Sequence, residues 1–420
     1  MVSRAGAVAL LAAQVACVSP HAPLAARPPP PERYTDAANP DPAVRMRAAD
    51  GLVADPSPEA TDMLLVLHQR DVDPEVRASA ADAIARRRDP RLEPALEQSA
   101  LADPHPMVRA AAARARERLW PWNKEPSSAA GWSLLCPGCG QFYLRNPTAG
   151  AGQLATAAAL ILSGALLVDG HTIGLSSASD SAKPAIGLQL LQTGQNLWFF
   201  SIFDAYRDAR VMRDDAGYRH PISRESLPYL ASAPFRPSVL ARPWVWAGVP
   251  AALAVGLGVA YLFDRGSVTG HPSIFDVRGL NVLGHDFRSR GAAFAAGEVY
   301  LGALFDPVGV GEESLFRGVI QSELDERFGT WGGLAAASGL FGAVHALNFI
   351  APDQDASQAL IAVPVISVLG AGLGLAYIRT GYRLETSVAM HFWYDFLLST
   401  ASFVVDPQHQ PFVVQYGMAL

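Results

Sequence analysis

The chain has 420 residues, which is long enough for two or three domains. Hydrophobic residues make up 50% of it and charged residues only 17%, and this balance favours a membrane protein. The formal net charge of −6 and the lack of a basic aromatic groove exclude nucleic acid as a partner, and three cysteines are too few for a disulfide framework.

The N-terminus has the pattern of a secretory signal peptide or a short membrane anchor. In residues 1–20 a single positive residue precedes an apolar stretch that ends at Ala16. Ala16-Cys17 is a candidate lipoprotein cleavage and acylation site, although Gln14 fits that motif poorly. A proline-rich linker follows over residues 21–40.

Residues 41–120 repeat a short motif with a period of 32 residues. The sequence DPAVR at 41–45 recurs as DPEVR at 73–77 and, with two extra residues, as DPHPMVR at 103–109. Asp-Pro caps a helix and starts its first turn, and an Ala-rich run follows each motif. The pattern resembles short HEAT-type repeats, in which stacked helix pairs share one core. We expect three antiparallel helix pairs before a flexible joint near 124–128, either as a protein- or peptide-binding arm or as a plain spacer.

Residues 128–212 have the pattern of a membrane hairpin. The segment 137–143 leads to an apolar run over Leu154–Val168, and a second run over Ile186–Phe203 ends in Asp-Ala-Tyr at 204–206. This unit resembles small bacterial two-helix membrane modules that open with Pro-Gly-x-Gly-Gln and close with Asp-Ala-Tyr. The resemblance predicts a membrane hairpin and implies little about chemistry.

Two further features of the hairpin concern its cysteines and its topology. Cys136 and Cys139 form a C-x-x-C, which is either a redox or zinc motif or simply two small residues at the start of the hairpin. We favour the second interpretation, because the sequence has no second such motif.

Five arginines after the hairpin indicate a cytoplasmic loop, namely Arg207, Arg210, Arg213, Arg219 and Arg224. A hairpin that ends inside also begins inside, whereas a cleaved signal peptide would put the repeats outside. A further crossing or re-entrant segment near 132–143 would reconcile the two.

The C-terminal part, residues 240–405, contains helix-length apolar segments in close succession. Pro243–Phe263 and Ser357–Ile378 carry no charge, and about 20 such residues match the thickness of the hydrocarbon core. The pattern predicts an amphipathic connector around 274–290, a tail at 406–420, and further helices over Gly291–Phe305, around Glu312, over Trp331–Ile350 and over Leu384–Val405. The expected fold is therefore all-α, a multi-pass transmembrane helical bundle preceded by a short HEAT-like α-solenoid.

Charged and aromatic side chains recur at spacings of four inside these apolar segments. In chain order the three motifs are Glu312-Glu313-x-x-x-Arg317, Phe341-x-x-x-His345 and His391-x-x-x-Asp395. A spacing of four places both members of a pair on one face of a helix. Because a charge at bilayer depth costs at least ~2.5 kcal/mol, such groups rarely persist there without a function. We expect a polar reaction chamber walled by transmembrane helices.

The order and spacing of these motifs resemble the CAAX-protease and bacteriocin-processing family of intramembrane proteases. Residues 306–318 closely match the first signature of that family, and the likeness covers roughly residues 240 to 405. The resemblance implies that two residues activate a water and that two others stabilise the oxyanion, these being Glu312 with His345 and His391 with Asp395.

The chemistry of peptide hydrolysis supports part of this assignment. Hydrolysis needs a water, a base that activates it and donors for the oxyanion. Glu312 is the candidate base, and His345 would help to position the water. Glu313 lies four residues before Arg317 and is expected to pair with it rather than to face the centre of the chamber. Phe341 is expected to pack.

Two points stay open at this stage. Well-known members of the family carry Asn at the position of Asp395, and an ionised Asp cannot donate a hydrogen bond. Asp395 is therefore expected either to be protonated or to orient His391. Glu312, His345 and His391 could also bind zinc, but the set works equally well as a metal-free glutamate protease, so we expect no required cofactor.

The leading hypothesis is a multi-pass endopeptidase of the bacterial inner membrane. Its substrate would be a peptide or a membrane protein, or it would serve in bacteriocin immunity. The alternatives are a non-catalytic membrane scaffold whose repeats bind a partner, and a transporter-like module that uses the buried charges for ion coupling. The presence of all three motifs argues against both alternatives.

Overall fold

The computed structural model describes residues 35–168, 182–263, 272–277, 279–349 and 359–407. Packing divides the chain into two compact units, Met1–Glu125 with Met212–Asp214 and Pro126–Val211 with Asp215–Leu420. Several sequence predictions fall outside the described residues: the signal peptide at 1–20, the acylation site at Cys17, most of the linker at 21–40 and most of the tail at 406–420.

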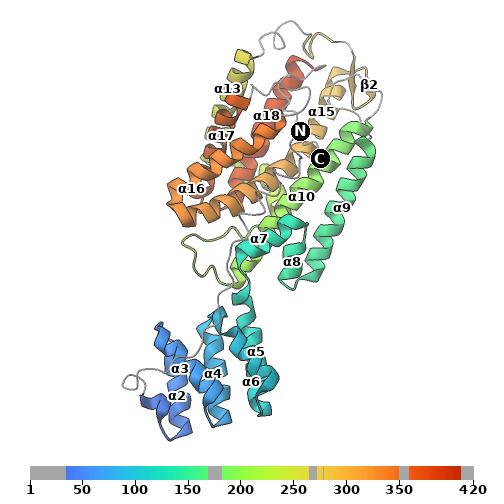
Figure 1. Cartoon of the computed structure of the whole chain (residues 1–420). Coiled ribbons are helices and arrows are strands. Elements are labelled where there is room, and N and C mark those ends of the chain that lie inside the picture. The colour runs from blue at the N-terminus through green and yellow to red at the C-terminus, as the bar shows by residue number, and fades with distance from the viewer. Residues whose placement is uncertain (1–34, 169–181, 264–271, 278, 350–358, 408–420) are drawn as a thin grey trace, which may run out of the picture. The chain divides into compact units, whose positions relative to one another are not determined.

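The first unit is a stack of helices that follows the sequence repeat (Figure 1). Its elements are η1 (Thr35–Ala38), α2 (Pro42–Leu52), α3 (Pro58–Arg70), α4 (Pro74–Arg87), η2 (Pro90–Leu92), α5 (Glu93–Ala102), α6 (Pro106–Leu119) and η3 (Trp120–Asn123). The first two Asp-Pro motifs start helices as expected, because the carboxylates of Asp41 and Asp73 accept hydrogen bonds from the Ala43 and Glu75 backbone N–H groups at 2.9 and 2.8 Å. The third motif does not, because α6 begins only at Pro106, after His105, which makes no side-chain cap hydrogen bond.

The repeat core is made mainly of alanine and leucine. α4 packs against α2, α3 and α6, and α5 packs against α6. Fully buried alanines such as Ala80 and Ala112 let these helices approach closely. The expectation of three helix pairs is wrong. The unit has two pairs, α2–α3 and α4–α5, and then α6, which ends at η3 before a second helix can follow within the described part of the unit.

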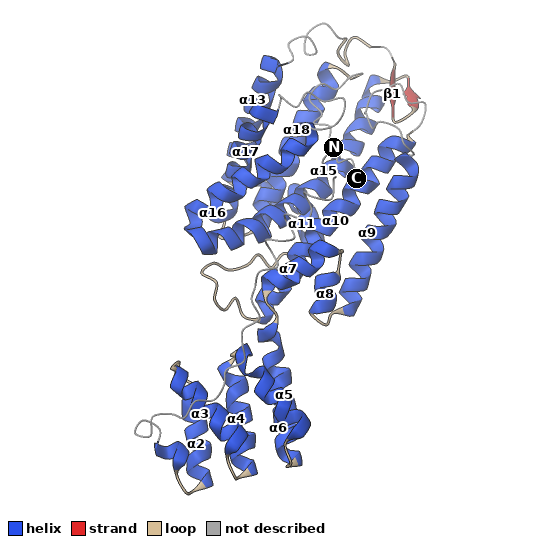
Figure 2. Cartoon of the chain, viewed as in Figure 1, coloured by secondary structure: helices blue, strands red, loops and turns tan. Residues whose placement is uncertain are grey.

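The second unit holds the remaining described elements, almost all of them helices (Figures 1 and 2). Its shorter elements are α7 (Pro126–Leu135), α8 (Cys139–Tyr143), α11 (Leu227–Ala231), η4 (Ala233–Phe235), α12 (Pro237–Leu240), the π-helical η5 (Ser314–Gln321) and η6 (Ala346–Phe349). Its long helices are α9 (Pro147–Val168), α10 (Lys183–Met212), α13 (Pro243–Phe263), α15 (Arg290–Glu313), α16 (Ser322–His345), α17 (Ala359–Arg379) and α18 (Leu384–Val405). The expected all-α fold is thereby confirmed.

Four helical stretches in the described part of the chain are long and apolar enough to cross a membrane, which makes this a multi-pass membrane protein. They are Pro147–Val168, the stretch Arg290–His345, Ala359–Arg379 and Leu384–Val405. The stretch Arg290–His345 is kinked at Gly329 of α16, whose φ of 73° and ψ of 162° are not helical. α10, which contains the second expected hairpin segment, forms over 30 residues but is not among them, because it carries four Gln or Asn side chains besides its charged C-terminal end.

The connector before α15 differs from the sequence prediction. Instead of an amphipathic segment around 274–290, it contains a two-stranded antiparallel hairpin, β1 (Leu280–Val282) and β2 (His285–Phe287) (Figure 2). The two residues between the strands, Leu283 and Gly284, have φ of 54° and 72°. Two positive φ angles in a two-residue loop make a type I′ turn, whose twist suits a hairpin.

The C-x-x-C motif lies in the turn between α7 and α8. Its two sulfur atoms are joined in a Cys136–Cys139 disulfide, a pairing that the sequence pattern did not predict. Gly138, between them, has φ +81° and lies so close to Gly150 that a Cβ would stand 2.2 Å from the Gly150 carbonyl oxygen. The turn therefore requires glycine at position 138. This glycine allows the first residues of α9 to pack directly against the turn.

Candidate active site

The first motif lies where α15 gives way to the π-helical segment η5. Glu312 and Glu313 are the last residues of α15, and Arg317 lies in η5. The sequence predicted an ordinary helix here. A π-helical turn is wider than an α-turn and is frequently found at functional sites. Both glutamates are buried, Glu313 completely.

The other two motifs come from separate helices of the same unit. Phe341 and His345 lie in the last turns of α16, and His391 and Asp395 lie one turn apart in α18. α18 packs against α15, and both α16 and α18 contact η5. All four side chains are buried. The fold thus brings together residues that are up to 83 positions apart in the sequence.

Glu312 faces both histidines. Its Oε2 atom lies 3.8 Å from the Nε2 atom of His345 and 3.8 Å from the Nε2 atom of His391. These distances are too long for direct hydrogen bonds. Oε2 is buried and has no hydrogen-bond partner among the described residues. A single water about 2.8 Å from each atom would fit these separations.

Glu313 has two partners where the sequence predicted one. Its Oε1 atom accepts a hydrogen bond from Arg317 Nη1 at 3.1 Å, as expected, and another from His391 Nδ1 at 2.8 Å. The expectation that Glu313 serves Arg317 alone is therefore incomplete. Its carboxylate also fixes the orientation of His391, because a carboxylate accepts and so leaves the Nδ1 proton on the imidazole.

His345 is held in the same way through its Nδ1 atom. This atom lies 2.7 Å from the backbone carbonyl oxygen of Phe341, which can only accept. In the neutral form of each imidazole the proton thus sits on Nδ1, and the Nε2 lone pair is directed toward Glu312. A histidine whose Nδ1 is fixed by an oxygen acceptor is the usual arrangement when Nε2 serves as a base or a ligand.

Arg317 and Phe341 build the support behind this group. Arg317 Nη2 donates to the Gly370 carbonyl oxygen of α17 at 2.8 Å, and the guanidinium lies 4.4 Å over the centroid of the Phe341 ring. The same ring lies 4.6 Å from His345 and 6.2 Å from His391, centroid to centroid. Phe341 therefore packs, as expected, and does so between the arginine and both histidines.

Asp395 lies on the far side of His391 from Glu313. Its Oδ2 atom is 3.3 Å from His391 Nε2 and has no hydrogen-bond partner among the described residues. Asp395 thus contacts the same ring nitrogen that faces Glu312. This geometry fits either alternative from the sequence, a protonated Asp395 at the oxyanion or a carboxylate that orients His391.

Sequence reasoning missed the contribution of α10. Tyr300 in α15 donates to the Ala185 carbonyl oxygen at 3.0 Å. A Cβ at Gly311 would stand 2.4 Å from Asn196 Oδ1, and one at Gly318 would stand 2.5 Å from the Phe203 ring. The three contacts have the same sequence offset of 115 residues, so α10 runs alongside α15 and η5 in the same direction. The two glycines, seven residues apart, were the available signal.

The side chains around Glu312 include groups of the types that bind metal ions. Across the parts of the chain that the structure describes, no three His, Cys, Asp or Glu side chains are placed as a metal site. The chemistry of the donors nonetheless suits zinc, because two imidazole Nε2 atoms and one carboxylate oxygen point at one another and both Nδ1 atoms are engaged.

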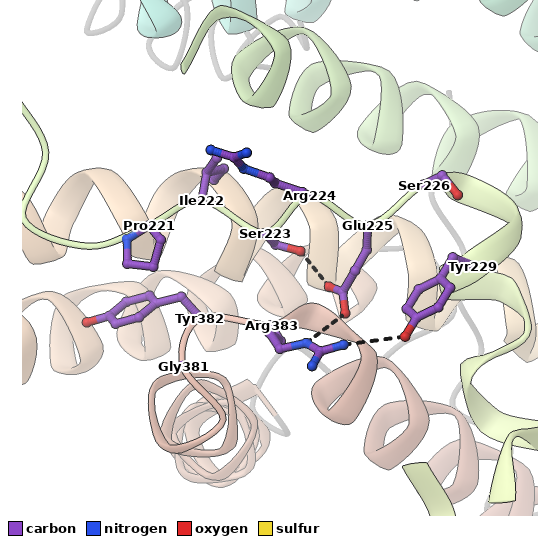
Figure 3. A pocket seen from close by; sticks show the side chains of 10 residues that line it. All are labelled: Pro221, Ile222, Ser223, Arg224, Glu225, Ser226, Tyr229, Gly381, Tyr382 and Arg383. Atoms are coloured by element: carbon purple, nitrogen blue, oxygen red, sulfur yellow. Dashed lines mark hydrogen bonds and ion pairs between the residues drawn. The ribbon is translucent and has the colours of Figure 1, made fainter. Parts of the chain in front are cut away.

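A separate cavity of about 460 Å³ lies at the turn between α17 and α18 (Figure 3). Glu225 and Arg383 face each other across it, with Tyr229 beside the guanidinium. Its lining includes none of the residues of the three motifs. The buried cluster around Glu312 is therefore separate from this cavity.

Comparison with protein-family models gives two matches. Residues 296–397 match the model of type II CAAX prenyl endopeptidases described as Rce1-like, a segment that contains all three motifs. Residues 34–116 match the model of HEAT repeats. No curated protein and no solved structure matches the chain significantly. The chain thus joins a segment similar to HEAT repeats to one similar to membrane endopeptidases, which supports an intramembrane endopeptidase in general.

Proposed function

We propose that this protein is an intramembrane endopeptidase in which Glu312 activates the attacking water. The observation that carries the proposal is the buried Oε2 atom of Glu312, without a hydrogen bond among the described residues and equally far from His345 and His391. A buried carboxylate oxygen left without a donor is costly unless a water or a substrate supplies one. The family-model match covers this residue and supports the same activity.

In the proposed mechanism the water donates one proton to Glu312 while its oxygen attacks the carbonyl carbon of the scissile bond. The C–N bond then breaks, the proton passes to the leaving amine, and a new carboxylate remains. The negative charge that develops on the carbonyl oxygen needs donors in place before the reaction. His391, in its protonated form, and a protonated Asp395 would supply them, which explains why the two share one side of the site.

Glu313, Arg317 and Phe341 are supporting residues in this account. Glu313 holds His391 through Nδ1, and Arg317 neutralises Glu313 and ties η5 to α17 through Gly370. In this account none of the three takes part in the proton transfer. They fix the reacting groups in place, because a displacement of about 1 Å can cost 100-fold in rate.

Zinc is the alternative activator of the same water. Glu312, His345 and His391 would hold the ion, and zinc would lower the pKa of a bound water toward 7. We favour the metal-free form, in which Glu312 itself takes the proton. Cleavage measured before and after treatment with a zinc chelator separates the two, since only the metal-dependent form would lose activity and regain it with added zinc.

The substrate in this proposal is a membrane-associated peptide or protein, cleaved in the inner membrane of a bacterium. The repeats at 41–120 would bind a protein partner, and the hairpin region 128–212 would act with 240–405 as one protease body, since α10 contacts α15 and η5. A non-catalytic scaffold or an immunity protein is the alternative. It would keep the buried network and would not use Glu312 as a base.

The experiment compares membrane-protein fragments from cells that carry the wild type, Glu312→Gln or Glu298→Gln. Glu298 is a matched control because it lies in α15 and accepts a hydrogen bond from Thr400 at 2.7 Å, which glutamine can also accept. Fragments should disappear only with Glu312→Gln, since removal of a general base lowers the rate about 10²–10⁴-fold. Identical fragments in all three strains, at equal protein levels, would favour the scaffold.

A further inference from the structure

The repeat unit is tied together by a ladder of arginine–aspartate pairs. Arg45 in α2 binds Asp71 through Nε and Nη2, at 2.7 and 2.9 Å. Arg77 in α4 binds Asp103 in the same way, at 2.9 Å for both bonds. In each case the aspartate lies 26 residues after the arginine, just beyond the second helix of the same pair. These hydrogen bonds raise the pKa of both arginines.

Each of these two arginines also donates hydrogen bonds to backbone carbonyl oxygens. Nη1 of Arg77 donates to the carbonyl oxygens of Asp71 and Val72, and Nη1 of Arg45 donates to those of Asn39 and Pro40. One edge of the guanidinium is thus anchored to the preceding loop. The other edge, formed by Nε and Nη2, projects toward the carboxylate and forms the bidentate contact that suits a planar guanidinium.

Arg109 in α6 is the third arginine of the ladder and has only half of this arrangement. Its Nη1 donates to the carbonyl oxygens of Asp103 and Pro104, at 2.9 and 3.1 Å, as in the other two. Among the described residues no carboxylate pairs with it. The residue 26 positions later is Leu135, so the chain itself supplies no aspartate at the matching position.

α6, the helix that carries Arg109, has no second helix paired with it among the described residues of the repeat unit. Val108, Ala112 and Leu119 of α6 are buried against α4 and α5. The opposite face of α6 is exposed and begins with Met107 and Ala110, followed by Ala113, Arg114 and Glu117. Small residues on such a face would admit a helix at close distance. The missing helix and the missing carboxylate belong to the same half-repeat.

We propose that Arg109 and the exposed face of α6 form a docking site for a partner segment that ends a helix with an aspartate. We call this site the open rung and define it by Met107, Arg109, Ala110 and Ala113. The segment would provide a packed helix and a carboxylate for Arg109. α3 with Asp71 provides these for Arg45, and α5 with Asp103 provides them for Arg77. The proposal specifies the partner assigned to the repeats and stands independently of the catalytic role of Glu312.

The two complete arginine–aspartate pairs of this chain, Arg45–Asp71 and Arg77–Asp103, indicate what kind of segment would bind at the open rung. Twice the structure shows a helix whose C-terminal aspartate binds an arginine anchored to two loop carbonyls, and the open rung repeats every element of that arrangement except the occupant. A neutral amide side chain has one oxygen and could not accept the hydrogen bonds from Nε and Nη2 on two separate oxygen atoms. A carboxylate accepts both bonds and neutralises the charge, which makes such hydrogen bonds about twice as strong as neutral ones.

The test uses the full-length protein in detergent and a fluorescent peptide with the sequence of residues 90–104, which contains α5 and Asp103. Anisotropy titration should show saturable binding, and Asp103→Asn in the peptide should raise the dissociation constant about tenfold, the equivalent of ~1.4 kcal/mol. In the protein, Arg109→Gln should weaken the Asp peptide to the level of the Asn peptide. Arg109→Lys keeps the charge but cannot form the bidentate contact, so its dissociation constant for the Asp peptide should lie between those of the wild type and Arg109→Gln.

Arg70→Gln is the matched control, because Arg70 is an exposed arginine at the end of α3 and outside the ladder. It should leave the dissociation constant unchanged. The proposal is overturned if the wild type shows no saturable binding, or if it binds the Asp and Asn peptides equally. It is also overturned if Arg109→Gln and Arg70→Gln have the same effect. The comparison of the two peptides on the wild type needs no variant protein, so it decides the matter even if Arg109→Gln fails to fold.

Discussion

Glu313, next to the proposed base Glu312, is fully buried and accepts hydrogen bonds from both Arg317 and His391. Glu313→Gln would remove the negative charge between two donors and leave Arg317 uncompensated. Breaking a buried pair in this way costs about 3–5 kcal/mol. We predict a clear fall in the thermal unfolding midpoint in detergent, together with loss of cleavage. Glu298→Gln should leave the midpoint nearly unchanged, and an equal fall in both variants would refute a special role for Glu313.

Asp395 allows a prediction in the opposite direction. Asp395→Asn keeps the shape of the side chain and provides a neutral donor close to His391 Nε2, where Asp395 Oδ2 now lies at 3.3 Å. If Asp395 acts in its protonated form as a donor, the variant should retain cleavage within about tenfold of the wild type. The measurement is the initial rate of fragment formation by the purified protein. Loss of activity comparable to that of Glu312→Gln would show that a carboxylate is needed there.

The spacing of polar side chains in apolar helices singled out the residues that the structure brings together around Glu312. It could not predict the second partner of Glu313, because the contact with His391 joins residues 78 positions apart and depends on how α18 is rotated against α15. Likewise the Nδ1 contacts that direct both Nε2 atoms toward Glu312 arise from tertiary packing.

The approach of α10 to η5 depends on Gly318. A Cβ added there would stand 2.5 Å from the Phe203 ring, so Gly318→Ala forces the ring or the helix to move. We predict a destabilisation of about 1–3 kcal/mol, as for other overpacked sites. In the background of Phe203→Ala the same change should cost much less. A double-mutant cycle of thermal midpoints in detergent measures this coupling.

Gly339→Ala is the control for that cycle, since a Cβ at Gly339 in α16 would meet no atom within 4 Å. It should be neutral or slightly stabilising, as expected for Gly to Ala in a helix. If Gly318→Ala and Gly339→Ala behaved alike, α10 would not be packed on η5 as described.

Elements were predictable where periodicity or composition is strong and unpredictable where single residues decide. The apolar segments gave α9, α17 and α18, and the Asp-Pro motifs gave the starts of α2 and α4. The hairpin of β1 and β2 depends on two positive φ angles at Leu283 and Gly284, which no periodicity reveals. The π-helical winding of η5 has no sequence signature of its own, and α6 looked like the first half of a pair that the unit does not complete.

At the scale of the whole molecule, the repeat unit should fold without the membrane unit. Burial, opposed by a hydrogen bond from Nδ1 to the Arg77 carbonyl oxygen at 3.1 Å, lowers the pKa of His68. A lowered histidine pKa means that the unfolded state binds the proton more readily. Stability is therefore complete above about pH 6.5, the unfolded value, and decreases as the pH falls below it.

We predict that a fragment of residues 35–125 is soluble and helical by circular dichroism and that its thermal midpoint decreases between pH 7.5 and pH 5.5. In His68→Gln, which does not titrate, the decrease should be much smaller. Asp103 does not account for this range. Burial raises its pKa, but hydrogen bonds from Arg77 and from the His105 backbone outweigh that effect and leave it lowered, so its contribution is lost only in more acidic solution. A disordered fragment, or equal pH dependence in both proteins, would contradict this account.

The most direct test of the central claim follows the oxygen atom of the attacking water. The purified full-length protein is placed in liposomes with its substrate membrane fraction in H₂¹⁸O, and fragments from a single turnover are analysed by mass spectrometry. The account predicts one ¹⁸O atom in each new C-terminal carboxylate with the wild type and no fragments with Glu312→Gln. Equal fragments from Glu312→Gln, or ¹⁸O in the Glu312 side chain instead of in the fragment, would contradict the role of Glu312 as the base that activates water.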